Sequence, residues 1–167
     1  MLIFLVGFMG CGKSYVGRHL APLLQYDYID LDKFIEDNEG MSVKEIFEQK
    51  GEAYFRNLEQ NFINNIDAQQ NIVISTGGGA PCFFDNMEIM NTKGITIYLN
   101  RSKKTTLERL HKGKHKRPLI ADLSDEELSD FYDERLAGRK PFYDKAQLHV
   151  GDADVEIILA MIREKIN

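Results

Sequence analysis

The stretch Gly7-Phe8-Met9-Gly10-Cys11-Gly12-Lys13-Ser14 decides the fold of this chain. It fits the pattern G-x-x-x-x-G-K-[ST] of a phosphate-binding loop. The apolar run Leu2–Val6, typical of a buried strand, precedes it directly, and the amphipathic stretch Lys13–Leu24, typical of a helix, follows it. Glycines let backbone N–H groups point at phosphate oxygens, and the positive N-terminus of a helix attracts the same anion. The sequence therefore predicts a strand, a phosphate-binding loop and a helix in succession.

The last residues of this loop carry the chemistry expected at a nucleotide. The ammonium of Lys13 is expected to reach the β- and γ-phosphates of ATP, and the hydroxyl of Ser14 to ligate Mg²⁺. Cys11 lies near a helix N-terminus, where a thiol becomes reactive, but a small residue tolerated between two glycines is the simpler interpretation. ATP and Mg²⁺ are the predicted co-substrate and cofactor, and the predicted nucleotide-binding residues of the loop are Gly10, Cys11, Gly12, Lys13, Ser14 and Tyr15. The loop itself does not indicate the acceptor.

The rest of the chain alternates short apolar runs with longer amphipathic stretches. Further strands are predicted at Tyr28–Asp30, Ile72–Ser75, Ile95–Leu99 and Gln147–Val150. Further helices are predicted from a capping box at Ser42, over 51–66, after Ser102, from a capping box at Ser124, and over Val155–Ile166. This order is typical of one three-layer α/β domain over residues 1–167, with a five-stranded parallel sheet flanked by helices. Ligands of such sheets bind at the carboxyl ends of the strands, so the loops after Val6, Ile29 and Ser75 are expected to share one edge.

Composition and charge exclude several other classes of protein. The 167 residues carry a net charge of -5, whereas nucleic-acid-binding proteins present a basic surface. The longest apolar runs, such as Leu2–Val6 and Ile95–Leu99, are far shorter than the ~20 residues of a membrane-spanning helix. Two cysteines, Cys11 and Cys82, are too few for a disulfide framework and are expected as free thiols. We therefore expect a cytoplasmic protein without nucleic-acid or membrane partners. A monomer is the expected state, although the composition does not indicate it.

Two acidic residues follow the second predicted strand, in the segment Asp30-Leu31-Asp32. One carboxylate there is suited to hold the hydration shell of Mg²⁺, and the other to accept a hydrogen bond from an acceptor hydroxyl. An aspartate at this point also serves as the N-cap of a helix, and the spacing alone leaves both interpretations open. Arg56, taken alone in its amphipathic helix, is interpreted as a solvated side chain, although a guanidinium is what recognition of a carboxylate requires.

Two loops later in the chain carry a marked composition. Thr76-Gly77-Gly78-Gly79 ends the third predicted strand, and because consecutive glycines are costly in conformational entropy, we interpret them as a place where a ligand approaches the backbone closely. The basic run Lys112–Pro118 is either a solvated loop or a mobile lid that brings Arg117 to the developing charge on the phosphates. His111 and His115 lie four residues apart, but no third ligand is near in sequence, so a metal site is not expected there.

A pair of arginines lies on the helix predicted after Ser124. Arg135 and Arg139 are four residues apart, near the point where Pro141 is expected to break this helix. Either both complement the helix C-terminus, or one of them points into the cleft. The spacing leaves both interpretations open.

Taken together, these segments resemble the shikimate kinases over nearly the full length of the chain. The resemblance rests on the phosphate-binding loop and on further segments in the family's order and spacing: Asp30-Leu31-Asp32, Phe55-Arg56-Asn57-Leu58-Glu59, Thr76-Gly77-Gly78-Gly79, Arg117-Pro118-Leu119 and Arg139-Lys140-Pro141-Phe142-Tyr143. The chain departs from the family's pattern at Cys11 and Tyr15, where serine and a small hydroxyl residue are usual. The resemblance implies a small P-loop kinase of the nucleoside-monophosphate-kinase type, with a substrate-binding helical segment at about 31–60 and a mobile lid at about 111–124.

The resemblance also implies a reaction and an acceptor site. The enzyme would transfer the γ-phosphate of ATP to the 3-hydroxyl of shikimate, in the pathway to chorismate and the aromatic amino acids. By position, Asp32 would bind the shikimate hydroxyls nearest the proton to be removed. Arg56 and Arg139 would hold the carboxylate, and Gly78 would offer its backbone N–H.

On the donor side, the resemblance assigns four residues. Asp30 would order Mg²⁺ beside Ser14 through water, Arg117 would be the lid arginine at the phosphates, and Arg109 would stack on adenine. The catalytic residues expected in this way are Lys13, Asp32 and Arg117.

Two alternatives remain beside this interpretation. A kinase of the same fold that phosphorylates gluconate or a nucleoside monophosphate would share the loop, but the pair Arg56 and Arg139 disfavours it. A nucleotide-dependent binding module without transfer activity is disfavoured by Asp32 and Arg117.

Overall fold

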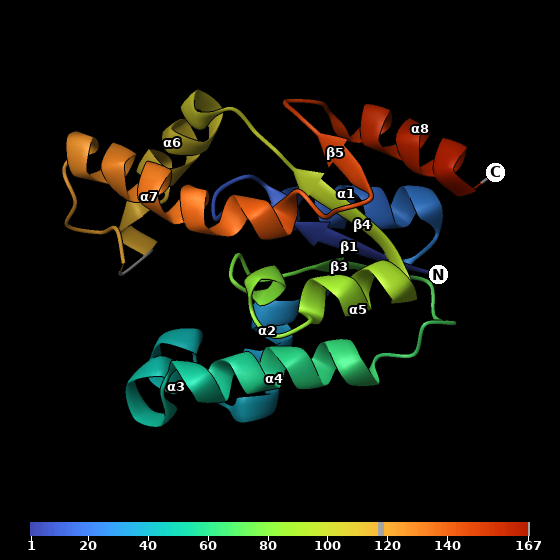
Figure 1. Ribbon diagram of the computed structural model, residues 1–167, viewed down its shortest axis with the longest axis horizontal. Helices are drawn as coiled ribbons and strands as arrows, with labels where there is room; N and C mark the ends of the chain where they lie inside the picture. Colours follow the sequence, from blue (N-terminus) through green and yellow to red (C-terminus); the bar gives the residue numbers. More distant parts are fainter. Residues whose placement is uncertain (117–118, 167) are drawn as a thin grey trace.

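Five parallel strands form the centre of the computed structural model, which describes residues 1–116 and 119–166 (Figure 1). The strands are β1 (Leu2–Val6), β2 (Asp27–Asp30), β3 (Ile72–Ser75), β4 (Gly94–Leu99) and β5 (Leu148–Val150). Their order in the sheet is β2-β3-β1-β4-β5, and every neighbouring pair is parallel. The predicted five-stranded parallel sheet is confirmed, and the carboxyl ends of β1, β2 and β3 lie side by side.

Eight α-helices lie among the described residues, two more than predicted. They are α1 (Lys13–Leu24), α2 (Leu31–Glu39), α3 (Val43–Lys50), α4 (Glu52–Asn65), α5 (Asn86–Lys93), α6 (Lys103–Lys112), α7 (Asp125–Tyr143) and α8 (Val155–Ile166), with short 3₁₀ turns η1 (Ala80–Cys82) and η2 (Lys114–Lys116). The sequence analysis missed α2 and α5. Both are short, and α5 lacks an apolar stripe, since Asn86 is buried in it beside Met87 and Met90.

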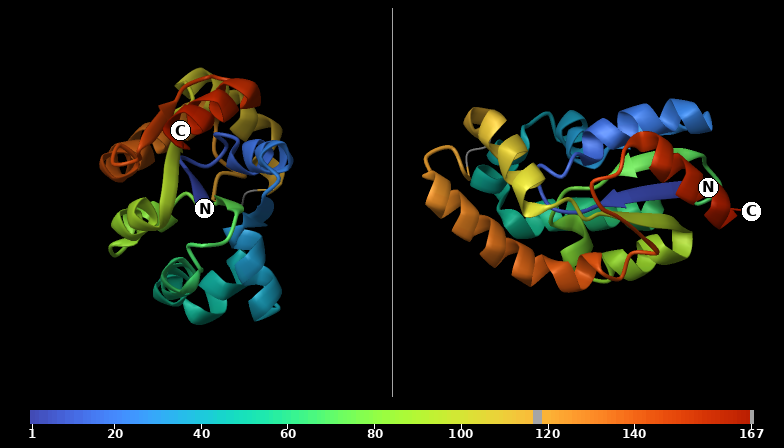
Figure 2. Two further views of the ribbon diagram at one scale, coloured as in Figure 1. Left: turned by 90° about the vertical axis from the view of Figure 1, so that its right-hand side faces the viewer. Right: turned by 90° about the horizontal axis from the view of Figure 1, so that it is seen from above.

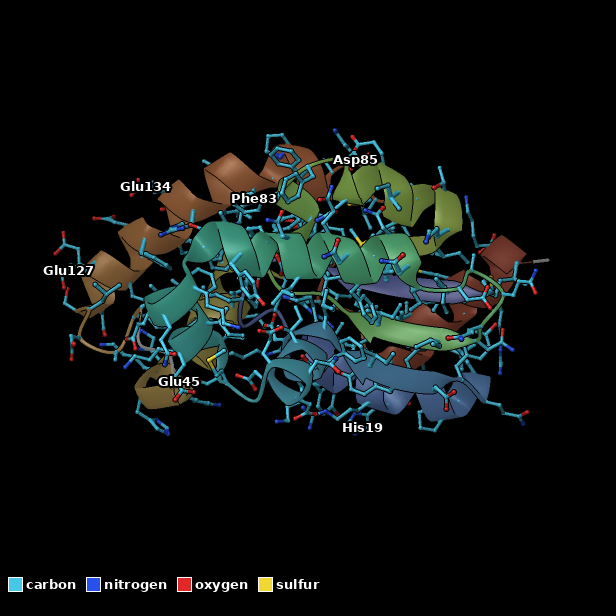
Figure 3. All side chains as sticks on the ribbon, turned by 90° about the horizontal axis from the view of Figure 1, so that it is seen from below. His19, Glu45, Phe83, Asp85, Glu127 and Glu134 are labelled. Carbon is cyan, nitrogen blue, oxygen red and sulfur yellow. The ribbon has the colours of Figure 1, made fainter. Side chains whose placement is uncertain are left out.

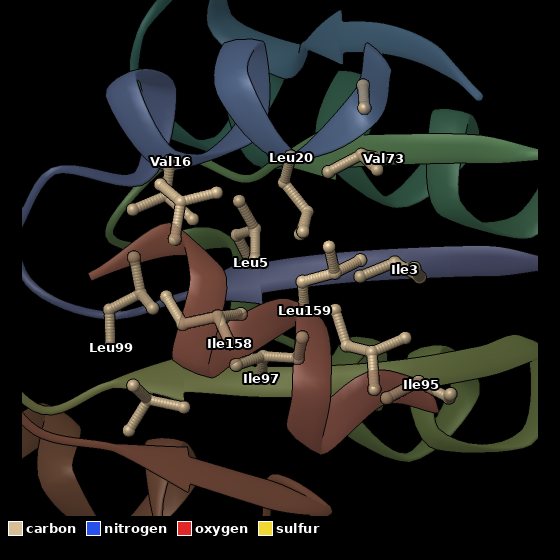
Figure 4. Packing of buried hydrophobic residues seen from close by; sticks show 14 of the residues in the cluster. Ile3, Leu5, Val16, Leu20, Val73, Ile95, Ile97, Leu99, Ile158 and Leu159 are labelled. Carbon is tan, nitrogen blue, oxygen red and sulfur yellow. The ribbon is translucent and has the colours of Figure 1, made fainter. Parts of the chain in front are cut away.

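The central strand explains why helices cover both faces of the sheet. All five residues of β1 are fully buried. Successive side chains of a strand point to opposite faces, so Ile3 and Leu5 pack with residues of α1 and α8 (Figure 4). Phe4 packs on the other side, with residues of α4, α5 and α7. Figure 2 shows this three-layer arrangement from two further directions.

Local capping signals in the sequence place several helix starts correctly. The capping boxes are present at Ser42 with Glu45 and at Ser124 with Glu127, and the Ser102 hydroxyl accepts a hydrogen bond from the N–H of Thr105 at 3.2 Å. The expected break at Pro141 is wrong, because α7 continues to Tyr143. A proline in the last turn removes only one hydrogen bond near an end that frays in any case.

Two smaller apolar clusters attach segments to the edge where β1, β2 and β3 end. Helices α2, α3 and α4 enclose Leu31, Ile46 and Phe55. Leu110 of α6 and Leu128 of α7 pack on the opposite side of the same edge. In the described part of the chain, no helix is long and apolar enough to cross a membrane.

Candidate active site

The phosphate-binding loop connects β1 to α1 at the centre of this edge. Gly10 and Gly12 have φ values of 78° and 97°, which side chains other than glycine rarely adopt. A Cβ on Gly12 would lie 2.6 Å from Nη1 of Arg109, which donates a hydrogen bond to the carbonyl oxygen of Cys11 at 2.9 Å. The loop therefore needs glycine at this position both for its turn and for the close approach of α6.

The ammonium of Lys13 lies inside the curve of the loop. Its Nζ donates hydrogen bonds to the carbonyl oxygens of Gly7 at 2.8 Å and Phe8 at 2.9 Å, and the side chain is nearly buried. Cys11 is buried too, its Sγ lies 3.8 Å from Nζ of Lys13, and it packs in the core beneath the loop as a small apolar residue. Cys11 and Cys82 are both free thiols, as predicted.

Ser14 and Asp30 form the oxygen-rich part of the cleft. The Ser14 hydroxyl donates a hydrogen bond to Oδ2 of Asp30 at 2.7 Å. Oδ1 of Asp30 accepts from the N–H of Lys33 at 3.4 Å, so Asp30 is the N-cap of α2, one of the two interpretations that the sequence left open. These hard oxygen donors suit Mg²⁺. Among the described residues, no group of three or more His, Cys, Asp and Glu could hold a metal ion.

Asp32 lies two residues after Asp30, in the first turn of α2. It lines a cleft of about 390 Å³ together with Lys13, Ser14, Thr76 and Gly78. Burial, and then the negative charge of Asp30, raise the pKa of Asp32 to about 6. A carboxylate with this pKa is charged at neutral pH and holds a proton more readily than an ordinary aspartate does.

Arg56 is buried in the structure, so the interpretation as a solvated side chain is wrong. Only 7% of it is exposed. Its Nη1 donates to Oε2 of Glu59 at 2.7 Å, and its Nε and Nη2 donate to Oε1 of Glu52 at 3.2 and 3.0 Å. The ring of Phe83 lies 4.3 Å from the guanidinium carbon, and Figure 3 shows this residue beside α4.

The three glycines after β3 make room for the side chains of the site. A Cβ on Gly77 would lie 2.7 Å from Oε1 of Glu59 and 2.8 Å from Oδ1 of Asp32. A Cβ on Gly79 would lie 2.6 Å from both Nη atoms of Arg56. The close approach predicted from the sequence is present, but in this structure it is made by the protein's own charged groups.

Arg139 faces the same glycines, whereas Arg135 does not. A Cβ on Gly78 would lie 3.1 Å from Nη1 of Arg139, and the Tyr143 hydroxyl donates to the carbonyl oxygen of Gly78 at 2.5 Å. Arg135 is exposed, with its guanidinium carbon 5.3 Å from the ring of Phe131. Of the two arginines, Arg139 is the one that lies against Gly78, which lines the cleft.

A second hollow of about 550 Å³ adjoins the phosphate cleft. Tyr15 and Arg109 line both, so the two form one continuous depression. Arg101 holds the segment after β5 that lines this hollow, because Nη1 of Arg101 donates to the carbonyl oxygens of Gly151 at 2.7 Å and Ala153 at 2.5 Å. This depression extends from the phosphate loop to the segment that follows β5, at residues 152–156.

The predicted lid covers residues 111–124, of which Arg117 lies outside the described residues. Ile120 is fully buried beside Phe8 and Leu128, and the ammonium of Lys114 donates to the carbonyl oxygen of Leu123. His111 lies 3.5 Å from a carboxylate oxygen of Asp125. The described part of the segment is thus anchored on the cluster between α6 and α7.

The comparison with protein families gives one match that covers most of the chain. The model of the shikimate kinase family matches residues 9–167. The chain belongs to the shikimate kinase family. A shikimate kinase of Parabacteroides distasonis is 47% identical over 146 residues, which cover 87% of this chain and 84% of that one. A shikimate kinase of Phocaeicola vulgatus is 42% identical, over 99% of this chain and 98% of its own.

Solved structures of shikimate kinases have the same fold. The crystal structure of the Bacteroides thetaiotaomicron shikimate kinase gives a TM-score of 0.91 at 41% identity and covers 99% of this chain and 98% of its own. The Acinetobacter baumannii shikimate kinase in complex with shikimate gives 0.84 at 33% identity, over 99% of this chain and 92% of its own. A deoxyadenosine kinase of M. mycoides, 20% identical with a TM-score of 0.58, shows the P-loop kinase fold alone.

Two residues at the site had no role in the sequence analysis. Glu59 lies one helical turn after Arg56, a spacing that predicts an ion pair on a helix, so this contact was accessible from the sequence. Phe83 lies in the loop after η1, and no local pattern indicates that its ring meets Arg56. Its contact depends on how that loop packs against α4.

Proposed function

We propose that this protein transfers the γ-phosphate of ATP to the 3-hydroxyl of shikimate. One observation carries the proposal: Asp32, Arg56 and Arg139 converge on Gly77, Gly78 and Gly79, beside the phosphate-binding loop. Two guanidinium groups suit a carboxylate, and a carboxylate with a raised pKa suits a hydroxyl that loses its proton. The match with a relative solved in complex with shikimate supports the same acceptor.

Positioning and charge account for most of the catalysis in this proposal. Arg56 and Arg139 hold the acceptor by its carboxylate, while Gly78 offers its backbone N–H and Asp32 accepts the proton of the attacking hydroxyl. Lys13 leaves the carbonyl oxygens of its own loop and neutralises the transferred phosphoryl group. Transfer is direct and in line, without a phosphoenzyme. The role of Arg117 at the phosphates rests on the resemblance alone.

Ser14 and Asp30 would hold Mg²⁺, Asp30 through water. When bound, this ion neutralises charge on the β- and γ-phosphates of ATP. The hydrogen bond between the Ser14 hydroxyl and Asp30 already aligns the two oxygens that this role requires. Tyr15 and Arg109 line both the phosphate cleft and the adjoining hollow. In this proposal the adenine of ATP occupies that hollow and stacks on Arg109.

The proposal includes a monomeric enzyme, in which one chain supplies all the residues assigned to the site. The helices between Leu31 and residue 60 act as the substrate-binding segment, and residues 111–124 as the lid. These two assignments rest on the resemblance to the family, and the separate apolar clusters of the two segments are compatible with them.

The test is ADP release with shikimate, gluconate, CMP and AMP offered in parallel at equal concentration. We expect ADP release with shikimate alone, and a single phosphate ester on its 3-hydroxyl by phosphorus NMR. Activity with gluconate or a nucleotide alone would support the related kinases instead. Release with no acceptor, in stoichiometric amount only, would support a nucleotide-dependent binding module.

A further inference from the structure

A second carboxyl group of the site, Glu59, is completely buried. It lies on α4, and none of it is exposed. Oε2 accepts the hydrogen bond from Nη1 of Arg56 at 2.7 Å, whereas Oε1 has no hydrogen-bond partner in the part of the chain that the structure describes. A buried oxygen without a partner is costly unless it gains a proton or a ligand.

Charged or titratable groups from four elements face Glu59. Arg56 lies on its own helix, Asp32 on α2, Arg139 on α7 and the Cys82 thiol on η1. Burial raises the pKa of Glu59 to about 7, although the two arginines oppose this, and the charge of Asp32 adds to the rise. The free site therefore has two arginines beside the buried Glu59 and Asp32, with Glu52 on the solvent side of Arg56.

A bound acceptor carboxylate changes this balance. Of the five N–H groups of Arg56, three donate to Glu52 and Glu59, so one N–H on each Nη atom is left for an acceptor among the described contacts. An acceptor carboxylate at these two groups would lie next to Glu59 and add a further negative charge to a site with two arginines. Of the carboxyl groups there, Glu59 is buried and has a free oxygen for a proton.

We propose that Glu59 takes up one proton from solvent on Oε1 when the carboxylate of the acceptor binds. The step rests on the proposed function, since it needs a carboxylate acceptor. Neutral Glu59 still accepts from Arg56 through Oε2, and its new O–H becomes a donor toward the acceptor or Asp32. Glu59 is thus a positioning residue whose protonation state sets the affinity for the acceptor, and affinity falls as pH rises.

Titration calorimetry with shikimate in two buffers of different ionisation heat measures the proton directly. At about pH 8 we expect uptake of roughly 0.5–1 proton per shikimate bound, and an affinity that falls up to about tenfold per pH unit above neutrality. Glu59→Gln mimics the neutral form, so its uptake should be near zero. Its affinity should equal the wild type near pH 6 and exceed it at about pH 8. Glu52→Gln is the matched control, because Glu52 binds the same guanidinium from the solvent side, and its proton uptake should equal the wild type.

Each other outcome is decisive. Undiminished uptake in Glu59→Gln overturns the assignment, and affinity that is weaker at every pH indicates a structural role only. If Glu59→Gln does not fold, calorimetry of the wild-type protein is sufficient, because shikimate binding without proton uptake between about pH 7 and 9 overturns the proposal. Absence of shikimate binding in the wild type would overturn the proposed function instead, and this inference with it.

Discussion

Gly79→Ala isolates the contact that positions Arg56. The backbone of Gly79 has φ and ψ values of -86° and -25°, which alanine adopts freely, so the substitution introduces no backbone strain. Its Cβ would lie 2.6 Å from both Nη atoms of Arg56, well inside the closest distance that such contacts show. The guanidinium must move, but Glu59, Glu52 and the ring of Phe83 hold it from three sides.

The expected magnitude follows from the hydrogen bonds that the displaced Arg56 loses. A hydrogen bond to a charged group contributes about 1.5–3 kcal/mol, so loss of one to the acceptor carboxylate raises the KM for shikimate roughly 10- to 100-fold. The KM for ATP should stay within about twofold, because the phosphate loop is untouched. Initial rates of ADP release at varied shikimate and at varied ATP give both constants.

Gly138→Ala serves as the matched control. It is the same chemical change on α7, and no atom lies within 4 Å of the added Cβ. It should leave both KM values unchanged and raise the free energy of unfolding by about 0.5–1 kcal/mol. An unchanged KM for shikimate in Gly79→Ala, in a variant that melts like the wild type, would refute the reasoning about Arg56.

Four further predictions concern groups on both sides of the cleft. Lys13→Met should lower kcat at least 100-fold, as measured by ADP release, while circular dichroism shows an unchanged fold. Because burial raises the pKa of Asp32 to about 6, kcat should fall as pH drops through about 6, and a flat profile from about pH 5 to 8 would count against proton transfer to Asp32. The raised pKa means that the folded state binds the proton of Asp32 more tightly than the unfolded chain does, so the free energy of unfolding is lower above about pH 6, where Asp32 is charged. Asp32→Asn removes this charge and should raise the free energy of unfolding at neutral pH by about 1–2 kcal/mol, as measured by urea denaturation. Arg139→Ala should raise the KM for shikimate at least 10-fold and Arg135→Ala less than twofold, and equal effects would contradict the assignment of Arg139 to the cleft.

Features set by local sequence were predicted well. The phosphate loop, the capping boxes at Ser42 and Ser124, and the parallel sheet follow from patterns that span a few residues. The convergence of the loops after β1, β2 and β3 followed from the topology. The resemblance to shikimate kinases then gave roles to residues that their own surroundings in the sequence did not explain.

Features set by packing between distant segments were missed or misread. Arg56 was interpreted as solvated because an arginine on an amphipathic helix usually is, and its burial depends on Gly79 and Phe83, more than twenty residues away. Helix α5 has no apolar periodicity, since its buried residues include Asn86, whose side chain donates to the carbonyl oxygen of Ala80 at 2.9 Å. Such contacts have no signature within one stretch of sequence.

The central claim is that the site selects its acceptor by the carboxylate held between Arg56 and Arg139. The direct test compares kcat/KM of the wild-type protein for shikimate and for its primary amide, which has nearly the same shape but no charge. We predict a loss of roughly 100- to 1,000-fold with the amide, carried mainly by KM, because two charge-assisted contacts weaken together. Equal kcat/KM values for acid and amide would contradict the claim.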